Sequence, residues 1–164
     1  MIVNEDLVPD KTNNITYPSS ILKLNSWEGT CSIEMSHEGI IQVTTGTGGW
    51  WGCALEMQSG GIGEDLSSFK DGAIHFSMKG NTSSTFILGF QTGSFARGTQ
   101  VNNFVTFGPD EKYSLKEDWT AYSIAVSELD NDADLTNVTG PIFFRGDKNF
   151  DGKNFYVKNI YYSK

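Results

Sequence analysis

Short runs of alternating apolar and polar residues, separated by glycine-rich or Asn/Asp-rich turns, recur along this chain. Ile74, Phe76 and Met78, for example, alternate with polar neighbours, the period of two at which strand side chains point to opposite faces. No segment of ten or more residues carries the 3.6-residue period of an amphipathic helix. The 18 glycines and 11 phenylalanines also fit many strands joined by tight turns. The sequence therefore predicts an all-β fold.

The strand signals begin near residue 21 and continue to the end of the 164-residue chain. Eight or more short strands favour a β-sandwich jelly roll of two antiparallel sheets, with a closed barrel as the alternative. Residues 1–20 are polar and contain Pro9 and Pro18, so we expect an entry arm or linker remnant there and the β-sandwich domain over residues 21–164. The expected strands cover residues 21–24, 31–35, 40–44, 50–57, 73–79, 85–91, 103–107, 119–126, 142–145 and 155–162, and residues 65–69 are expected to form one helical turn capped by Asp65.

The formal net charge of −8 argues against nucleic acid and anionic membranes as partners, because both attract basic surfaces. No stretch of 18 or more apolar residues is present, so no membrane helix is expected. A neutral polysaccharide is indifferent to the sign of the protein's charge. The charge therefore excludes two classes of partner and leaves carbohydrate open.

The sequence contains no recognisable catalytic set. GxSxG and HExxH patterns are absent, and no Ser/His/Asp grouping is supported by adjacency. His37 lies in a turn, and His75 is expected on the outward face of a strand, where it either lines a binding face or is solvated. We expect no enzyme activity; the alternative is a small jelly-roll glycan lyase or hydrolase.

Two adjacent tryptophans follow a glycine-rich loop at residues 45–49. Neighbouring residues of a strand face opposite ways, and Trp51 shares its face with Cys53 and Leu55. Trp50 is therefore expected to be exposed and Trp51 to be core, unless a bulge reverses the order. An exposed indole can stack on the flat C–H face of a sugar ring, as carbohydrate sites require.

Sugar hydroxyls need planar donors and acceptors, and the segment from Gln91 to Asn103 supplies several within a glycine-containing loop. Loops on a rigid scaffold often carry binding groups. Arg145, at the end of a strand, is a further contributor. The candidate ligand-binding residues are Trp50, Trp51, His75, Gln91, Phe95, Arg97, Asn103 and Arg145, whereas Trp27 and Trp119 are interpreted as structural.

Two features bear on covalent and metal chemistry. Cys31 and Cys53 lie in different expected strands; they either pair, if those strands are adjacent, or stay as small buried thiols. Asp147, Asn149 and Asp151 have the oxygen-ligand spacing of a calcium loop but lack the later Glu. A structural Ca²⁺ and a plain Asp-Gly turn both remain open there.

The order of several segments resembles a known family, the galactose-binding-like β-jelly-roll carbohydrate-binding modules appended to bacterial glycoside hydrolases. The resemblance covers most of residues 22–163 and is closest to the β-glucan-binding members. It is carried by structural motifs rather than by ligand contacts. The motifs are at residues 49–52, 65–69, 119–127, 134–138, 142–144 and 155–162.

The resemblance implies a non-catalytic module that binds a β-linked polysaccharide, with β-glucan favoured, and targets an attached glycan-degrading enzyme. It also implies a secreted or cell-surface location, with any signal peptide outside this sequence, and a structural calcium near an acidic residue of the last strand. Lys158 occupies that region here, which speaks against that particular metal site. A protein-binding adhesion module is the remaining alternative.

Overall fold

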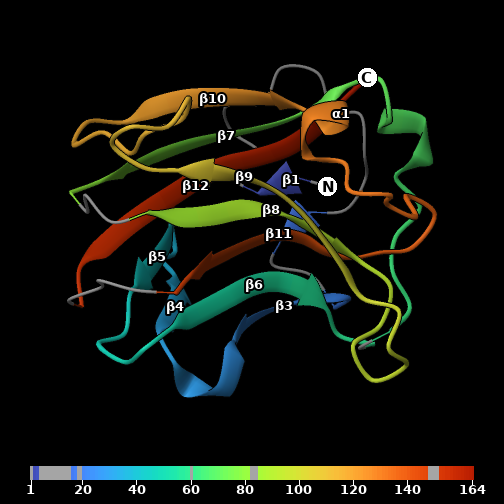
Figure 1. Ribbon diagram of the computed structural model, residues 1–164, viewed down its shortest axis with the longest axis horizontal. Helices are drawn as coiled ribbons and strands as arrows, with labels where there is room; N and C mark the ends of the chain where they lie inside the picture. Colours follow the sequence, from blue (N-terminus) through green and yellow to red (C-terminus); the bar gives the residue numbers. More distant parts are fainter. Residues whose placement is uncertain (1, 4–15, 18–19, 60, 82–84, 148–151) are drawn as a thin grey trace.

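Two β-sheets packed face to face carry most of the regular structure in the computed structural model (Figure 1), which describes residues 2–3, 16–17, 20–59, 61–81, 85–147 and 152–164. Between these sheets lies one hydrophobic core. Because the two sheets are separate, the closed-barrel alternative is wrong. The expected all-β, two-sheet sandwich is confirmed.

The five-stranded sheet is antiparallel throughout. Its central strand, β11, pairs with β6 on one edge and β8 on the other, so residues far apart in the sequence lie side by side. In spatial order its strands are β3 (Leu22–Ser26), β6 (Trp51–Met57), β11 (Val138–Gly146), β8 (Phe86–Thr92) and β9 (Val101–Phe107).

The second sheet is organised around β12, the red strand of Figure 1. One edge of β12 pairs with β7, which pairs with β10; the other pairs with β5, which continues to β4, and with β1. The bounds are β12 Asn154–Ser163, β7 Ala73–Gly80, β10 Thr120–Ala125, β5 Ile41–Thr44, β4 Ser32–Met35, β1 Ile2–Val3 and β2 Thr16–Tyr17.

The strands β1 and β2 lie within residues 1–20, where an entry arm is expected from the sequence. β5 covers only residues 154–157 of the β12 edge, which leaves unpaired backbone groups beyond them. Ile2 pairs with Tyr161 on that remaining length, and β2 then pairs with β1 in parallel. Ile2–Val3 and Thr16–Tyr17 are thus part of the sheet.

Helical structure among the described residues is limited to α1 (Val126–Leu129) and 3₁₀ turns at Trp27–Gly29 and Ser67–Phe69. The expected helical turn is present at Ser67–Phe69, but its N-cap residue is Leu66 rather than Asp65. Asp65 precedes the cap, and its Oδ1 accepts a 2.9 Å hydrogen bond from the backbone N–H of Ser67. Among these residues we find no helix with the length and hydrophobicity needed to cross a bilayer.

The core follows the alternation read from the sequence. Ile74, Phe76 and Met78 of β7 are all buried, as expected. At its centre Phe86 stacks on Phe155 with ring centroids 5.4 Å apart. Since Phe86 belongs to β8 and Phe155 to β12, this contact joins the two sheets, and the side chains that point away from it form the two outer faces.

Candidate functional site

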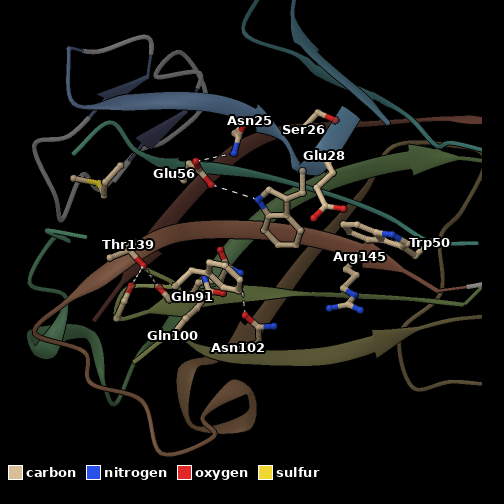
Figure 2. A pocket seen from close by; sticks show the side chains of 14 residues that line it. Asn25, Ser26, Glu28, Trp50, Glu56, Gln91, Gln100, Asn102, Thr139 and Arg145 are labelled. Carbon is tan, nitrogen blue, oxygen red and sulfur yellow. Dashed lines mark hydrogen bonds between the residues drawn. The ribbon is translucent and has the colours of Figure 1, made fainter. Parts of the chain in front are cut away.

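A cleft of about 460 Å³ lies on the outer face of the five-stranded sheet (Figure 2). Residues of all five strands and of the segments that precede or follow them line it, so the cleft runs across the sheet. The lining residues are Asn25, Ser26, Trp27, Glu28, Trp50, Glu56, Met57, Gln91, Gly93, Phe95, Gln100, Asn102, Thr139 and Arg145.

Small residues of β6 give Trp27 its place on this face. Trp51, Cys53 and Leu55 point into the core, so Gly52 must face outward. A Cβ atom at Gly52 would lie 2.3 Å from Cε3 of Trp27, which shows that the indole rests directly on the glycine backbone. On β11, Phe143 stacks against the same indole with centroids 5.9 Å apart. Trp27 therefore rests on Gly52 and Phe143.

Glu56 orients the indole of Trp27 by accepting a hydrogen bond from the ring N–H. Oε2 of Glu56 lies 3.5 Å from Nε1 of Trp27, while Oε1 accepts a 2.9 Å hydrogen bond from Nδ2 of Asn25. Nζ of Lys23 is 3.5 Å from the same Oε1. Figure 2 shows Asn25 and Glu56 joined on one side of the cleft. The carboxylate thus acts as a shared acceptor that orients its neighbours.

Arg145 and Trp50 form the second aromatic element, at the other end of the cleft in Figure 2. The Arg145 guanidinium carbon lies 5.5 Å from the Trp50 ring centroid, within cation–π range. Nε of Arg145 also donates to Oδ1 of Asp147 at 3.1 Å. Because Asp147 balances its charge, Arg145 serves mainly to hold the half-buried Trp50 and to offer its remaining N–H donors.

Amide side chains from β8 and β9 gather on the remaining side of the cleft (Figure 2). Nε2 of Gln91 donates to Oδ1 of Asn102 at 2.9 Å. Gln91 is 4% exposed and Asn102 is half-buried, so the Asn102 amino group is the more accessible of the two amides. Thr139 Oγ1 donates to the Gly93 carbonyl at 2.7 Å, which ties β11 to the end of β8. Gln100 is exposed beside them.

Four of the residues singled out from the sequence meet in this cleft: Trp50, Gln91, Phe95 and Arg145. Phe95 is the most exposed of them, with 83% of its surface accessible. Trp51 is 1% exposed and packs on Phe155, so its inclusion as a binding residue is wrong. The alternation that favoured Trp50 as the outward indole holds because no bulge interrupts the pairing of residues 51–55 of β6 with β11.

Three other candidate residues from the sequence lie outside this cleft. His75 is on β7 of the opposite sheet, where it stacks on Tyr161 at 4.5 Å, and partial burial lowers its pKa. Asn103 is fully buried and binds backbone, its Oδ1 accepting from the N–H of Asn131 at 2.9 Å. The neighbouring Asn102 takes the outward position instead. Arg97 is exposed and does not line the cleft.

Trp27 is the main residue that the sequence interpretation missed. The sequence predicts a structural role for Trp27, yet its side chain lines the cleft. A signal was present, because Lys23, Asn25 and Trp27 alternate with Leu22 and Leu24 and so share the outward face. Glu56 is outward by the same rule.

Trp119 lies on the opposite outer face. Nζ of Lys158 is 4.2 Å and Nζ of Lys79 is 5.2 Å from its ring centroid. The two lysines project from β12 and β7 away from the core, since their neighbours Val157 and Met78 are buried. Trp119 is therefore a natural control for effects in the cleft.

The calcium-like loop is only partly described, because Asn149 and Asp151 lie outside the described residues. Asp147 is described, and its carboxylate is engaged by Arg145, which competes with any cation. Elsewhere in the described part of the chain, no group of three or more His, Cys, Asp or Glu side chains is placed to hold a metal.

Comparison with known proteins gives a consistent result. The family model described as carbohydrate binding domain 30 matches residues 7–164. A family 30 carbohydrate-binding module from a cellulosomal cellulase of Clostridium thermocellum is 18% identical, with 84% of this chain and 83% of that chain covered and a TM-score of 0.60. No curated protein matches.

Two further solved structures have the same fold. Another family 30 carbohydrate-binding module is 18% identical over 85% of this chain and 91% of its own, with a TM-score of 0.63. A family 29 module variant complexed with cellulohexaose is 15% identical over 86% of this chain and 79% of its own, with a TM-score of 0.52.

Proposed function

The chain belongs to the carbohydrate-binding domain 30 family, and from that membership we propose that its cleft binds a neutral β-linked glucan without cleaving it. The observation that carries the proposal is the placement of Trp27 and Trp50 in one cleft with the amides of Gln91 and Asn102. Members of the family are jelly-roll modules that bind carbohydrate, which agrees with the resemblance read from the sequence. The identity of the glycan is the new element.

The two indoles suit a sugar whose ring faces are flat. A β-linked glucose unit carries its hydroxyls equatorially, so both faces expose C–H groups that can lie on an aromatic ring. Each ring held against an indole buries apolar area and gains the weak attraction of the π face. Because Gly52 and Phe143 support Trp27, and Arg145 supports Trp50, little rotamer entropy is lost when the sugar binds.

The polar groups of the cleft suit hydroxyls rather than anionic groups. The one cation among the described residues that line it is paired, since Arg145 meets Asp147; Glu56 is paired with Lys23, and the exposed Glu28 adds a negative charge. A carboxylate or sulfate on the ligand would therefore meet no unpaired cation among the lining residues described. The amides of Gln91 and Asn102 can donate to and accept from hydroxyls, which gives a neutral glycan directional contacts.

The engagement of the carboxylates in the cleft favours binding over hydrolysis. A glycosidase places two carboxyl groups across the bond to be broken, one of them as a general acid. Glu28 and Glu56 are the carboxylates among the lining residues described, and Glu56 is occupied by Asn25, Trp27 and Lys23. We infer that the module targets an attached glycan-degrading enzyme in a secreted or cell-surface protein rather than acting itself.

Affinity electrophoresis against mixed-linkage β-glucan, laminarin, xylan and mannan tests this function. We expect retardation by at least one β-glucan, no release of new reducing ends, and the same retardation for Trp119→Ala, which alters only the opposite face. Retardation by none of the four would contradict the proposal and would favour a protein-binding role. Release of reducing ends would make the module an enzyme.

Substitution of Gly52 tests whether glucan binding requires Trp27 to pack on the backbone of Gly52. The added methyl group of Gly52→Ala would overlap the indole at 2.3 Å, so the ring must leave its position on β6. We expect the dissociation constant for the glucan to rise about tenfold, or roughly 1.4 kcal/mol, as measured by isothermal titration calorimetry.

The matched control is Gly49→Ala. No atom lies within 4 Å of a Cβ atom built at Gly49, although this residue directly precedes Trp50. Its affinity should equal that of the unmodified protein. Equal affinities for both variants would show that the position of Trp27 on Gly52 is not required.

A further inference from the structure

The two cysteines lie next to each other beneath the turn that carries Trp27. Cys31 follows that turn, and Cys53 is on β6, where it pairs with Ser26 in the ladder between β3 and β6. Sγ of Cys31 is 3.7 Å from Oγ of Ser26 and donates to the carbonyl of Gly52, the residue before Cys53, at 3.2 Å. Both thiols are free in this structure.

The two thiols differ in pKa and in solvent access, which both govern disulfide exchange. A hydrogen bond with the Cys53 thiol is the largest contribution that lowers the pKa of Cys31, to about 7, while partial burial opposes it. Burial raises the pKa of Cys53. Because the thiolate is the attacking species, Cys31 is suited to attack first.

Solvent exposure also favours Cys31 over Cys53 as the first thiol to react. Cys53 is fully buried, whereas Cys31 is partly exposed. Cys31 lines a shallow depression between its own turn and the glycine-rich loop, together with Thr30, Ser32 and residues 44–50. A small molecule can therefore reach Cys31 from the surface but cannot reach Cys53 in the folded protein.

We propose that Cys31 is a modification site for low-molecular-weight disulfides and that the reaction ends in a Cys31–Cys53 disulfide. The Cys31 thiolate attacks one sulfur of the disulfide, forming a mixed disulfide and releasing one thiolate. Cys53 then gives up its proton to solvent and attacks Cys31 Sγ, which forms the internal bond and releases the second thiolate. Two protein thiols are oxidised and one small disulfide is reduced to two thiols.

The cross-link closes a loop of residues 31–53 that contains Trp50 near one end, and Trp27 lies just outside its other end. Trp27 precedes Cys31 by four residues, and Trp50 precedes Cys53 by three. The bond would add a covalent link between the Trp27 turn and β6, which now meet through the packing of Trp27 on Gly52 and through hydrogen bonds such as that from the Gly52 N–H to Oγ1 of Thr30 at 3.0 Å. Closing such a loop restricts the unfolded chain, so the oxidised protein should be more stable.

The test treats the full chain with oxidised glutathione and follows its intact mass, its free thiols and its melting temperature, with no glycan present. We expect the unmodified protein to lose two hydrogens and both free thiols, keep no glutathione, and melt about 5 °C or more higher. Cys53→Ala should stop with one glutathione on Cys31. Cys31→Ala should keep its buried thiol unreacted while folded.

Two results would overturn the proposal. One is an unmodified protein that keeps both thiols, or keeps glutathione attached, after the treatment. The other is a Cys31→Ala variant that reacts as fast as the unmodified protein. The mass of the unmodified protein decides the matter even if a variant fails to fold.

Discussion

Replacing Trp27 with alanine is expected to weaken glucan binding by about 30-fold or more, equivalent to about 2 kcal/mol, the scale of an aromatic hot spot. The substitution removes the indole that Gly52, Phe143 and Glu56 hold in place. It also exposes Phe143, which lacks the hydrogen-bonding edge that Trp27 presents. Isothermal titration calorimetry with a β-glucan hexasaccharide measures the effect.

A conservative variant separates stacking from simple loss of structure. Trp27→Phe keeps an aromatic face over Gly52 but loses the N–H that approaches Glu56, so it should retain part of the affinity. Trp119→Ala should retain all of it. If Trp27→Ala bound the hexasaccharide as tightly as the unmodified protein, the cleft described here would not be the binding site.

Replacing Trp51, the buried residue that follows Trp50, with alanine is expected to lower the free energy of unfolding by about 3–5 kcal/mol. This is the usual cost of removing a large aromatic side chain from the core. Trp51 is 1% exposed and lies against Phe86 and Phe155, with ring centroids 6.2 and 5.8 Å away. Few side chains can move to fill the space that it leaves. Urea unfolding, followed by circular dichroism, gives the change directly.

Trp50→Ala is the matched control for that experiment. Its indole is half-buried on the outer face beside Arg145, so its removal should cost less than about 1 kcal/mol of stability while weakening glucan binding. The two neighbours should thus separate stability from affinity. A large loss of stability for Trp50→Ala, with a loss of affinity but not of stability for Trp51→Ala, would mean that Trp50 is the buried indole and Trp51 the outward one.

The fold could be predicted from the sequence because local patterns and burial agree along most strands. The alternation in β7 placed Ile74, Phe76 and Met78 in the core, and the same rule separated Trp50 from Trp51. The short strands β1 and β2 could not be predicted in this way. They form because β12 is longer than the partner β5 that covers its edge, and that mismatch depends on tertiary pairing.

The site was predictable only where a side chain's direction follows from a strand. Gln91 and Arg145 extend outward from β8 and β11 and were found. Asn102 and Asn103 are adjacent and have the same side chain, so the sequence does not show which of them faces outward. Asn103 faces inward, where its side chain hydrogen-bonds to the backbone of Phe90 and Asn131. His75 is outward as expected, but on the other sheet, because strand direction does not reveal which sheet a strand joins.

The central claim is that a β-glucan binds on the outer face of the five-stranded sheet, between Trp27 and Trp50. The most direct measurement is the NMR titration of the four tryptophan indole N–H signals with a β-glucan hexasaccharide. We predict that the signals of Trp27 and Trp50 shift together and saturate, while that of Trp119 on the opposite face does not move. Shifts at Trp119 alone, or no shift at Trp27 and Trp50 at saturating glucan, would contradict the account.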